Sequence, residues 1–148
     1  MQVSDLDAVL AIEKLCFPMP WSRFAFQTEL TQNHYALYIV GKIGGQIVAY
    51  AGAWIILDEA HITNVAVHPD WQGRGLGREI LLALLARAKV RGATRATLEV
   101  RKHNTQAQRL YRKYGFYYRG VRPGYYTDTG EDALIMWKDS LDDVVNQV

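Results

Sequence analysis

The sequence has a single cysteine, Cys16, among its 148 residues, so no disulfide bond can form within the chain. A lone cysteine is typical of a protein from a reducing compartment. The first residues carry acidic side chains early and lack the basic start and long apolar core of a signal peptide. We therefore expect a cytoplasmic protein in which Cys16 packs as a small apolar side chain.

A strong net charge is also absent, because 17 Lys and Arg residues nearly balance 15 Asp and Glu residues, for a formal charge of +2. This balance gives no argument for nucleic-acid binding, and no apolar run is long enough to predict a membrane span. No G-x-S-x-G nucleophile elbow is present. We also expect no metal site, because the histidines lack the spacing of metal ligands; they are His34, His61, His68 and His103.

The length and composition are those of one globular domain, so we expect residues 1–148 to form a single domain. Hydrophobic periodicity predicts two helices, three strands, a helix, a strand, a helix and two strands. The expected helices begin near Ser4 and at Arg23 and cover roughly 78–90 and 104–114, and the expected strands are 35–42, 46–56, 60–68, 95–101, 116–122 and 132–138.

Local signals mark several boundaries between these elements. Ser4 and Asp7 have the spacing of a capping box at the start of the first helix, and Ser22 has the position of an N-cap for the second. Gly44 and Gly45 supply the positive φ angles of a tight hairpin turn. The helix before residue 95 is long enough for a right-handed crossover between parallel strands. We therefore predict an α/β fold with a mixed, mostly antiparallel central sheet, a parallel pair at its centre, and flanking helices.

The stretch HPDWQGRGLGREI, residues 68–80, has three glycines at alternate positions between a strand and a helix. Unpaired amides and a positive helix dipole favour anions at such a junction, and glycines let an anion approach the backbone. Nearby arginines suit phosphate oxygens. The pattern predicts a pyrophosphate cradle, although a tight turn with solvated arginines also fits. It lacks the lysine of a Walker loop and the spacing of a dinucleotide fingerprint.

The spacing Q-x-x-G-x-G, formed by Gln72, Gly75 and Gly77, resembles the GNAT superfamily of acetyl-CoA-dependent N-acetyltransferases. Its context, NVAVHPDWQGRGLG, is similar to the cofactor-binding strand, loop and helix of that superfamily. Over almost the whole chain, the segments FPMPWS, YAGAWIILDEAHITNVAV, TLEVRKHNTQAQRLYRKYGF and YYTDTGEDALIMWK resemble the RimI-type group of ribosomal-protein-alanine N-acetyltransferases. The resemblance implies acetyl-CoA as cosubstrate and direct transfer to the N-terminal α-amine of a small-subunit ribosomal protein. We expect the protein to be a monomer.

The resemblance also assigns two catalytic residues. Glu99 of LEVR corresponds to the general base, acting directly or through water, and Tyr111 of RLYRKYGF corresponds to the general acid. From the residues alone, Glu99 is equally well a solvated glutamate on an edge strand, and Tyr111 an ordinary core tyrosine. A phenol with a pKa near 10 stays protonated at neutral pH and can donate to a thiolate.

The same resemblance places the cofactor against main-chain groups of the third strand, with Val67 as the expected oxyanion donor. It implies that Asn104, the N-cap of the following helix, also touches the cofactor. The expected cofactor-binding residues are Val65, Ala66, Val67, Gln72, Gly73, Arg74, Gly75, Leu76, Gly77, Arg78 and Asn104.

Two aromatic segments look like peptide-gripping loops in related N-terminal acetyltransferases. They contribute Phe17 and Trp21 from FPMPWS, and Tyr125 and Tyr126 near the C-terminus. A loop that merely covers the core is the competing interpretation for the tyrosines. Acidic residues could attract a basic peptide; they are Asp58, Glu59, Asp128, Glu131 and Asp132, the last of which also fits a turn cap.

The sequence leaves other functions open. Other protein N-termini, a lysine or a small amine would suit the same enzyme class. A non-catalytic module that only binds coenzyme A is an alternative from a different class.

Overall fold

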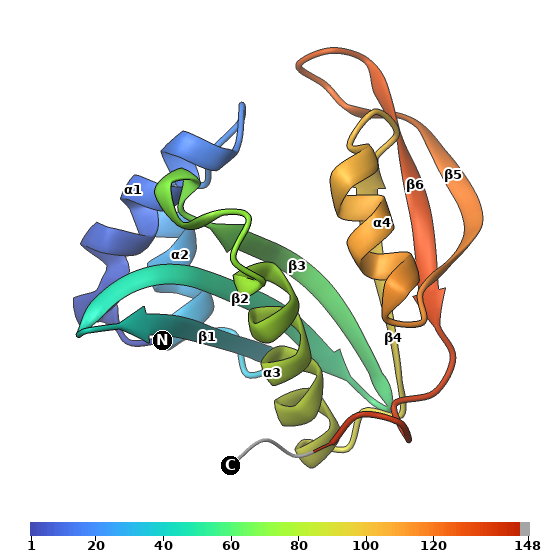
Figure 1. The fold of residues 1–148 in the computed structure, drawn as a ribbon, viewed down its shortest axis with the longest axis horizontal. Helices are drawn as coiled ribbons and strands as arrows, with labels where there is room; N and C mark the ends of the chain where they lie inside the picture. The colour runs from blue at the N-terminus through green and yellow to red at the C-terminus, as the bar shows by residue number, and fades with distance from the viewer. Residues whose placement is uncertain (146–148) are drawn as a thin grey trace.

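A computed structural model describes residues 1–145, and its elements follow the predicted order along one six-stranded sheet (Figure 1). The strands lie in the order β1-β2-β3-β4-β6-β5, and only β3 and β4 are parallel. The predicted mixed sheet with a central parallel pair is therefore confirmed. The elements are η1 (Val3–Asp5), α1 (Leu6–Cys16), α2 (Arg23–Thr31), β1 (Ala36–Ile43), β2 (Gln46–Ile56), β3 (Glu59–Val67), η2 (Pro69–Trp71), α3 (Leu76–Val90), β4 (Arg95–Arg101), α4 (Thr105–Lys113), β5 (Tyr117–Tyr126) and β6 (Glu131–Lys138).

The parallel pair is joined over only part of its length. Pairing runs from Glu59 opposite Arg95 to Ile62 opposite Leu98, and then β3 and β4 diverge. Figure 1 shows the result as a V, with β1–β3 on one arm and β4, β6 and β5 on the other. The divergence coincides with a β-bulge in β3. Gly52 of β2 is paired with Asn64 and the next residue, Ala53, is paired with Ile62, so Thr63 is an extra residue without a partner in β2. A bulge bends its strand and increases the local twist, which directs β3 away from β4.

Two hydrophobic cores cover opposite faces of the sheet. On one face, leucines of α3 and Tyr111 of α4 pack against strand residues that include Ile62 and Leu98. On the other face, α1 and α2 pack Ile12 and Phe26 against β1–β3. Burying each fully apolar side chain of this size contributes about 1.5–3 kcal/mol. Among residues 1–145, no helix combines the length and apolar character needed to cross a membrane.

The local signals were mostly confirmed. The side chain of Ser22 accepts a hydrogen bond from Ala25 N and caps α2, and Gly44 and Gly45 have φ angles of 58° and 81° in the β1–β2 turn. The predicted capping box of Ser4 with Asp7 is wrong, because η1 precedes α1 and a box forms at η1 between Gln2 and Asp5.

The expected strands 116–122 and 132–138 leave a loop over residues 123–131 between them, and in the structure this loop is shorter. Residues 123–126 continue β5, and a register shift between Arg122 and Tyr126 accommodates Pro123. Proline is tolerated there because β5 is an edge strand, where a missing N–H breaks no ladder bond on its outer side.

Gly52 offers a test of how tightly the β1–β2 pair packs. It lies opposite Tyr38, and a Cβ atom at position 52 would come within 2.0 Å of the Tyr38 ring. Tyr38 is only 6% exposed and is held by hydrogen bonds to Thr63 and Glu29. We therefore expect Gly52→Ala to lower the free energy of unfolding by about 2 kcal/mol or more, since overpacking a core typically costs about 1–3 kcal/mol.

Urea denaturation measures this change, and Gly41→Ala is the matched control. A Cβ at Gly41 would meet its nearest neighbours at 3.6 Å, an ordinary contact. The control is expected to change the free energy of unfolding by less than about 1 kcal/mol. Equal effects of the two substitutions would show that Tyr38 moves aside freely.

Candidate active site

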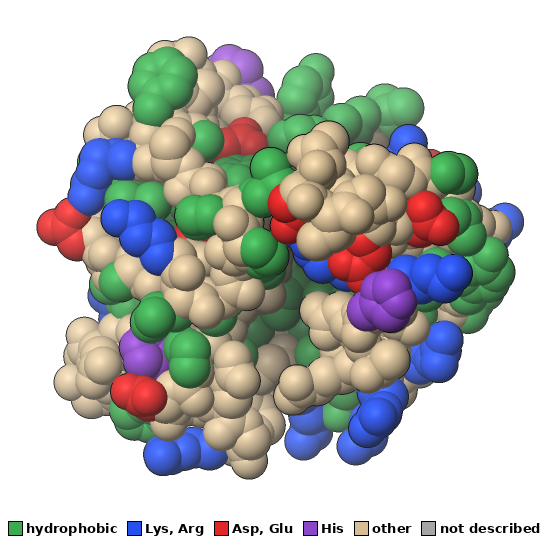
Figure 2. Space-filling view, turned by 90° about the horizontal axis from the view of Figure 1, so that it is seen from above, with side chains coloured by type: hydrophobic (Ala, Val, Ile, Leu, Met, Phe, Trp, Pro, Cys, Tyr) green, Lys and Arg blue, Asp and Glu red, His purple; other side chains and the backbone are tan. Residues whose placement is uncertain are grey.

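The divergence of β3 and β4 opens a cavity of about 470 Å³. Seen from the open end of the V, the surface is hollowed between two lobes (Figure 2). The walls come from α1, β2, β3, β4 and α4, from the α1–α2 loop and from the end of β5. The lining includes the two predicted catalytic residues, Glu99 and Tyr111, and all four predicted substrate-binding residues, Phe17, Trp21, Tyr125 and Tyr126.

Glu99 lies on an inner strand, so the alternative of a solvated edge-strand glutamate is wrong. Strand β4 runs between β3 and β6, and the Glu99 side chain is only 11% exposed. One carboxylate oxygen lies 2.6 Å from His61 Nε2, and the other forms an ion pair with Arg122 Nε at 3.2 Å. Burial alone would raise the pKa of Glu99, but the contacts with His61 and Arg122 outweigh it and hold the pKa below its ordinary value. Glu99 is therefore a carboxylate at neutral pH.

Tyr111 is a core residue and a cavity residue at the same time. Its ring packs against Phe116 in the core beneath α3 and α4, with 5.8 Å between the ring centroids, and it also lines the cavity. Burial raises the pKa of its hydroxyl, which therefore stays protonated at neutral pH. The two readings of Tyr111 from the sequence are thus compatible.

Glu99 and Tyr111 belong to opposite faces of the sheet. Side chains alternate along β4, so that Leu98 and Val100 enter the core with Tyr111 while Glu99 points to the other face. The two side chains reach one cavity only because β3 has moved away from β4 beyond Ile62. A proton acceptor and a proton donor therefore flank the opening from its two sides.

The third strand presents main-chain groups to this opening. His68 N donates to Val48 O at 2.8 Å, and an antiparallel ladder alternates, so Ala66 and Asn64 are the next residues bonded to β2. The main-chain groups of Val65 and Val67 consequently point to the side that β4 has left. Consistent with this direction, Val67 O accepts from Cys16 Sγ at 3.3 Å and from Gln72 Nε2 at 3.1 Å.

The glycine-rich loop follows directly, between η2 and α3. Gly73 and Gly75 both have φ angles of 79°, and a Cβ at either position would meet no atom within 4 Å. Gly75 is the N-cap of α3, so the first amides of a 15-residue helix begin here. Gly77 instead lies in the first helical turn, where a Cβ would contact Leu110 at 3.5 Å.

The other residues of this segment also have defined environments. Arg74 lies over the ring of Trp71 at 4.8 Å, and within residues 1–145 neither Arg74 nor Arg78 forms an ion pair with a carboxylate. Leu76 packs against the core below. Open space, exposed amides and available guanidinium groups suit a bound diphosphate. Asn104 is confirmed as an N-cap, because its Oδ1 accepts from Ala107 N at 3.1 Å, and it too lines the cavity.

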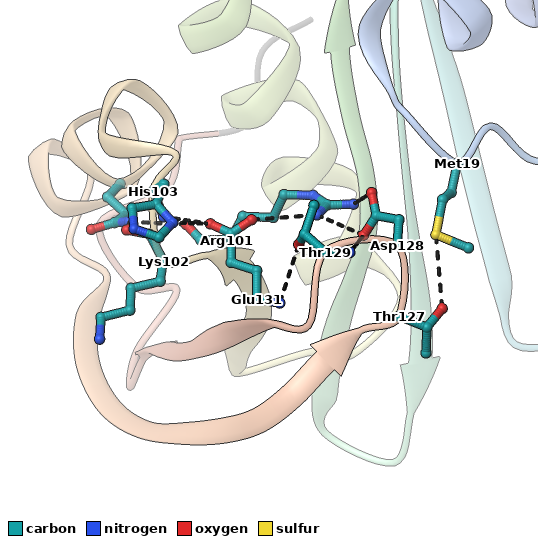
Figure 3. A network of polar contacts seen from close by, with 9 residues as sticks. Met19, Arg101, Lys102, His103, Thr127, Asp128, Thr129 and Glu131 are labelled. Atoms are coloured by element: carbon teal, nitrogen blue, oxygen red, sulfur yellow. Dashed lines mark hydrogen bonds and ion pairs between the residues drawn. The ribbon is translucent and has the colours of Figure 1, made fainter.

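The two aromatic segments, which both line the cavity, are in contact with each other. Thr127 Oγ1, at the β5–β6 turn, lies 3.9 Å from Met19 Sδ in the α1–α2 loop (Figure 3). The turn is held by Arg101, which makes two contacts of 3.1 Å with Asp128 and one of 3.4 Å with Glu131, and which stacks 4.0 Å from the Tyr126 ring.

The acidic residues expected to attract a basic peptide lie at two separate places, and most of them contact arginines. Asp58 and Glu59 lie at the joined end of the β3–β4 pair, where both contact Arg95. Asp128 and Glu131 pair with Arg101 at the other end of the sheet. Asp132 accepts from Gly124 N at 2.9 Å, which confirms its reading as a turn cap.

Sequence reasoning missed the partners that surround the predicted residues. His61 and Arg122 are separated from Glu99 by 38 and 23 positions, and nothing in their local patterns indicates the contact. Glu13, at 2% exposure, accepts from Tyr50 Oη and from Trp21 N at 2.8 Å, and so anchors the α1–α2 loop. Its burial raises its pKa.

Comparison with known proteins gives a consistent result. The model of the Acetyltransferase (GNAT) family matches residues 6–116. A protein of Bacillus subtilis (strain 168), named as a candidate ribosomal protein bS18-alanine N-acetyltransferase, is 44% identical over 137 residues, covering 93% of this chain and 91% of the relative. The ribosomal protein bS18-alanine N-acetyltransferase of Escherichia coli (strain K12) is 36% identical over 138 residues, covering 92% of each.

The fold agrees as well. The crystal structure of the ribosomal-protein-S18-alanine N-acetyltransferase from Escherichia coli superimposes with a TM-score of 0.84 at 37% identity, covering 93% of this chain and 88% of that one. A family model that spans most of the chain, relatives above 30% identity over nearly its whole length, and a shared fold lead to one conclusion: the chain belongs to the GNAT acetyltransferase family.

Proposed function

We propose that this N-acetyltransferase transfers the acetyl group of acetyl-CoA to the α-amine of the N-terminal alanine of ribosomal protein bS18, in the cytoplasm. The observation that carries the proposal is the opening between β3 and β4, which brings Glu99 and Tyr111 together from opposite faces of the sheet. The substrate follows from the relatives in Bacillus subtilis and Escherichia coli, which are named for that reaction.

The cofactor site is the glycine-rich loop and the exposed edge of β3. Main-chain amides between residues 72 and 78, with Arg74 and Arg78, hold the diphosphate of acetyl-CoA. The main-chain groups of Val65 and Val67 hold the pantetheine arm, and the amide of Val67 donates to the thioester carbonyl oxygen. The expected main-chain contact of Ala66 is dropped, because its main-chain groups are bonded to β2. An oxyanion donor of this kind is typically worth about 3 kcal/mol in a transition state.

The chemistry requires two proton movements. A protein α-amine has a pKa of about 7.7–8.0, so most of it must lose a proton before it attacks the thioester. The Glu99 carboxylate promotes that loss on one side of the opening, and the Tyr111 hydroxyl protonates the departing thiolate on the other. A carboxylate with a lowered pKa and a phenol with a raised pKa are each in the required protonation state at neutral pH.

Direct transfer in a ternary complex is favoured over a covalent acetyl-enzyme. Cys16 is the one thiol of the chain, and it lines the cavity. Burial and the nearby Glu13 raise the pKa of this thiol, and its hydrogen is donated to Val67 O. A thiol is a much weaker nucleophile than a thiolate.

The substrate peptide enters beneath the contact between the α1–α2 loop and the β5–β6 turn. Phe17, Trp21, Tyr125 and Tyr126 line this entrance, and the Tyr125 and Tyr126 rings pack edge to face at 5.1 Å. Aromatic side chains provide a large contact area with little loss of conformational entropy. Purified protein should therefore acetylate a peptide with the N-terminus of bS18 with a higher kcat/KM than a polyamine or an N-blocked lysine peptide.

A mass-spectrometric comparison of cellular N-termini, with and without the protein, checks the substrate directly. Loss of acetylation at bS18 is the expected result. An unchanged bS18 N-terminus, together with a change at another amine, would contradict the proposed substrate. Binding of acetyl-CoA without transfer to any amine would indicate a non-catalytic module.

Gly75→Leu tests the phosphate cradle. The side chain would occupy the open space above the first amides of α3, so we expect the Kd for acetyl-CoA to rise roughly tenfold or more, a loss of about 1.4 kcal/mol. Gly45→Leu is the matched control, because Gly45 has a φ of 81° and equally open surroundings, but lies in the β1–β2 turn. Calorimetric titration with acetyl-CoA should separate the two variants, and equal affinities would contradict the cradle.

Tyr111→Phe tests the acid. Removing the hydroxyl should lower kcat roughly 100-fold, as loss of a general acid typically does, while the Kd for acetyl-CoA stays nearly unchanged. Tyr114→Phe, one turn further along on the face of Tyr111, removes a hydroxyl that does not line the cavity and should leave kcat unchanged. Steady-state kinetics with the bS18 peptide provides the measurement, and a fully active Tyr111→Phe variant would exclude the role.

A further inference from the structure

The contact between His61 and Glu99 is a hydrogen-bonded pair inside the cavity. His61 Nε2 and a carboxylate oxygen of Glu99 are 2.6 Å apart, and both residues line the cavity wall. Since Glu99 is held as a carboxylate by its surroundings, the hydrogen between the two atoms comes from the imidazole. A neutral His61 with its hydrogen on Nε2 leaves Nδ1 as the basic nitrogen of the pair.

The two partners differ in their access to solvent. The Glu99 side chain is 11% exposed, and both of its oxygens are engaged, by His61 and by Arg122. The His61 side chain is 35% exposed, and its ring packs edge to face with Trp54, with 6.0 Å between the ring centroids. The imidazole thus connects a buried carboxylate to water.

The arginines near His61 and Glu99 are themselves paired with carboxylates. The elements around His61 carry several titratable and charged groups. They are Glu59 on β3 and Arg95 on β4 (paired with each other), Glu99 on β4, Arg122 on β5, Glu29 on α2 (bonded to Trp54 Nε1 at 2.8 Å), Glu13 on α1, and Arg101 and Tyr126 at the cavity mouth. Arg122 and Arg101 are each paired with carboxylates, so neither presents an uncompensated positive charge to the imidazole.

We propose that His61 is a further catalytic residue, which takes up the proton released by the substrate amine while Glu99 orients the imidazole and stabilises the imidazolium. The inference rests on the proposed function, since it refines how the amine of that reaction is deprotonated. The arrangement follows the logic of a nucleophile–base–carboxylate triad, in which the carboxylate stays ionised and fixes the tautomer of its histidine. Imidazole is also the side chain that most often transfers protons in enzyme active sites.

The protons balance over the reaction. The ammonium group of the substrate gives one proton to His61 Nδ1, and the neutral nitrogen attacks the thioester carbonyl carbon. As the C–N bond forms and the C–S bond breaks, Tyr111 protonates the sulfur, and the new amide nitrogen loses its second proton, which restores the Tyr111 hydroxyl. The proton on His61 then leaves to water from the exposed side of the ring, so one proton is released per acetyl group transferred.

His61→Gln separates proton uptake from positioning. A glutamine side chain retains an N–H that can donate to Glu99, but it cannot accept a proton. We expect kcat/KM for the bS18 peptide to fall roughly 100-fold, the effect of losing a general base. The rise of kcat/KM with pH should move to higher pH in the variant, because the amine, with a pKa of about 7.7–8.0, then has to lose its proton without the imidazole.

His103→Gln is the matched control. His103 also contacts a glutamate, with Nδ1 at 2.7 Å from Glu131, but its side chain is 85% exposed and does not line the cavity. It should keep wild-type kcat/KM and pH dependence. The thermal midpoint and the Kd for acetyl-CoA verify that His61→Gln is folded, and His61→Thr replaces it if it is not.

The outcomes discriminate clearly. Wild-type activity and an unshifted pH profile in the folded His61 variant would overturn this inference and leave the proposed function intact. A wild-type protein that ignores the bS18 peptide but acetylates a lysine peptide or a polyamine would overturn the proposed function, and the same variant comparison then applies to that amine. A wild-type protein that acetylates no amine contradicts both.

Discussion

The end of pairing between β3 and β4 is the constraint on which the site depends. A single extra residue, Thr63, turns β3 away from its parallel neighbour after Ile62. Without that turn, Glu99 and Tyr111 would be separated by a closed sheet, each facing its own hydrophobic layer. The unpaired backbone of β3 and the cavity are two results of the same bulge. The molecule therefore gives up several ladder hydrogen bonds in its centre, and the two cores on either side compensate for that loss.

Charge pairing defines the chemistry within this opening. Glu99 is ionised despite burial because His61 and Arg122 contact its two oxygens. Tyr111, by contrast, has no hydrogen bond or ion pair with a charged side chain among residues 1–145, and burial raises the pKa of its hydroxyl, so it remains a neutral donor. Environments that push an acid and a base to opposite protonation states are characteristic of active sites.

The sequence predicted most of the architecture and the main site residues, for identifiable reasons. Alternation, capping residues and glycines are local signals, and they placed Ser22, Asn104 and the β1–β2 turn correctly. The sequence did not reveal the bulge. Buried and half-buried residues alternate along β3 as in a regular strand, although Ile62 and Asn64 belong to opposite faces of the sheet. The contacts of Glu99 with His61 and Arg122 depend on strand order, which no local pattern encodes.

The contact of Met19 with Thr127 connects the α1–α2 loop to the β5–β6 turn (Figure 3), and Met19 also lines the cavity. A trench open along its length would accept any stretch of an extended polypeptide laid into it. The contact narrows this trench at one point, between two exposed side chains. A free chain end fits beneath it with less displacement of either side chain than internal backbone, which continues on both sides, so we expect the entrance to favour chain ends.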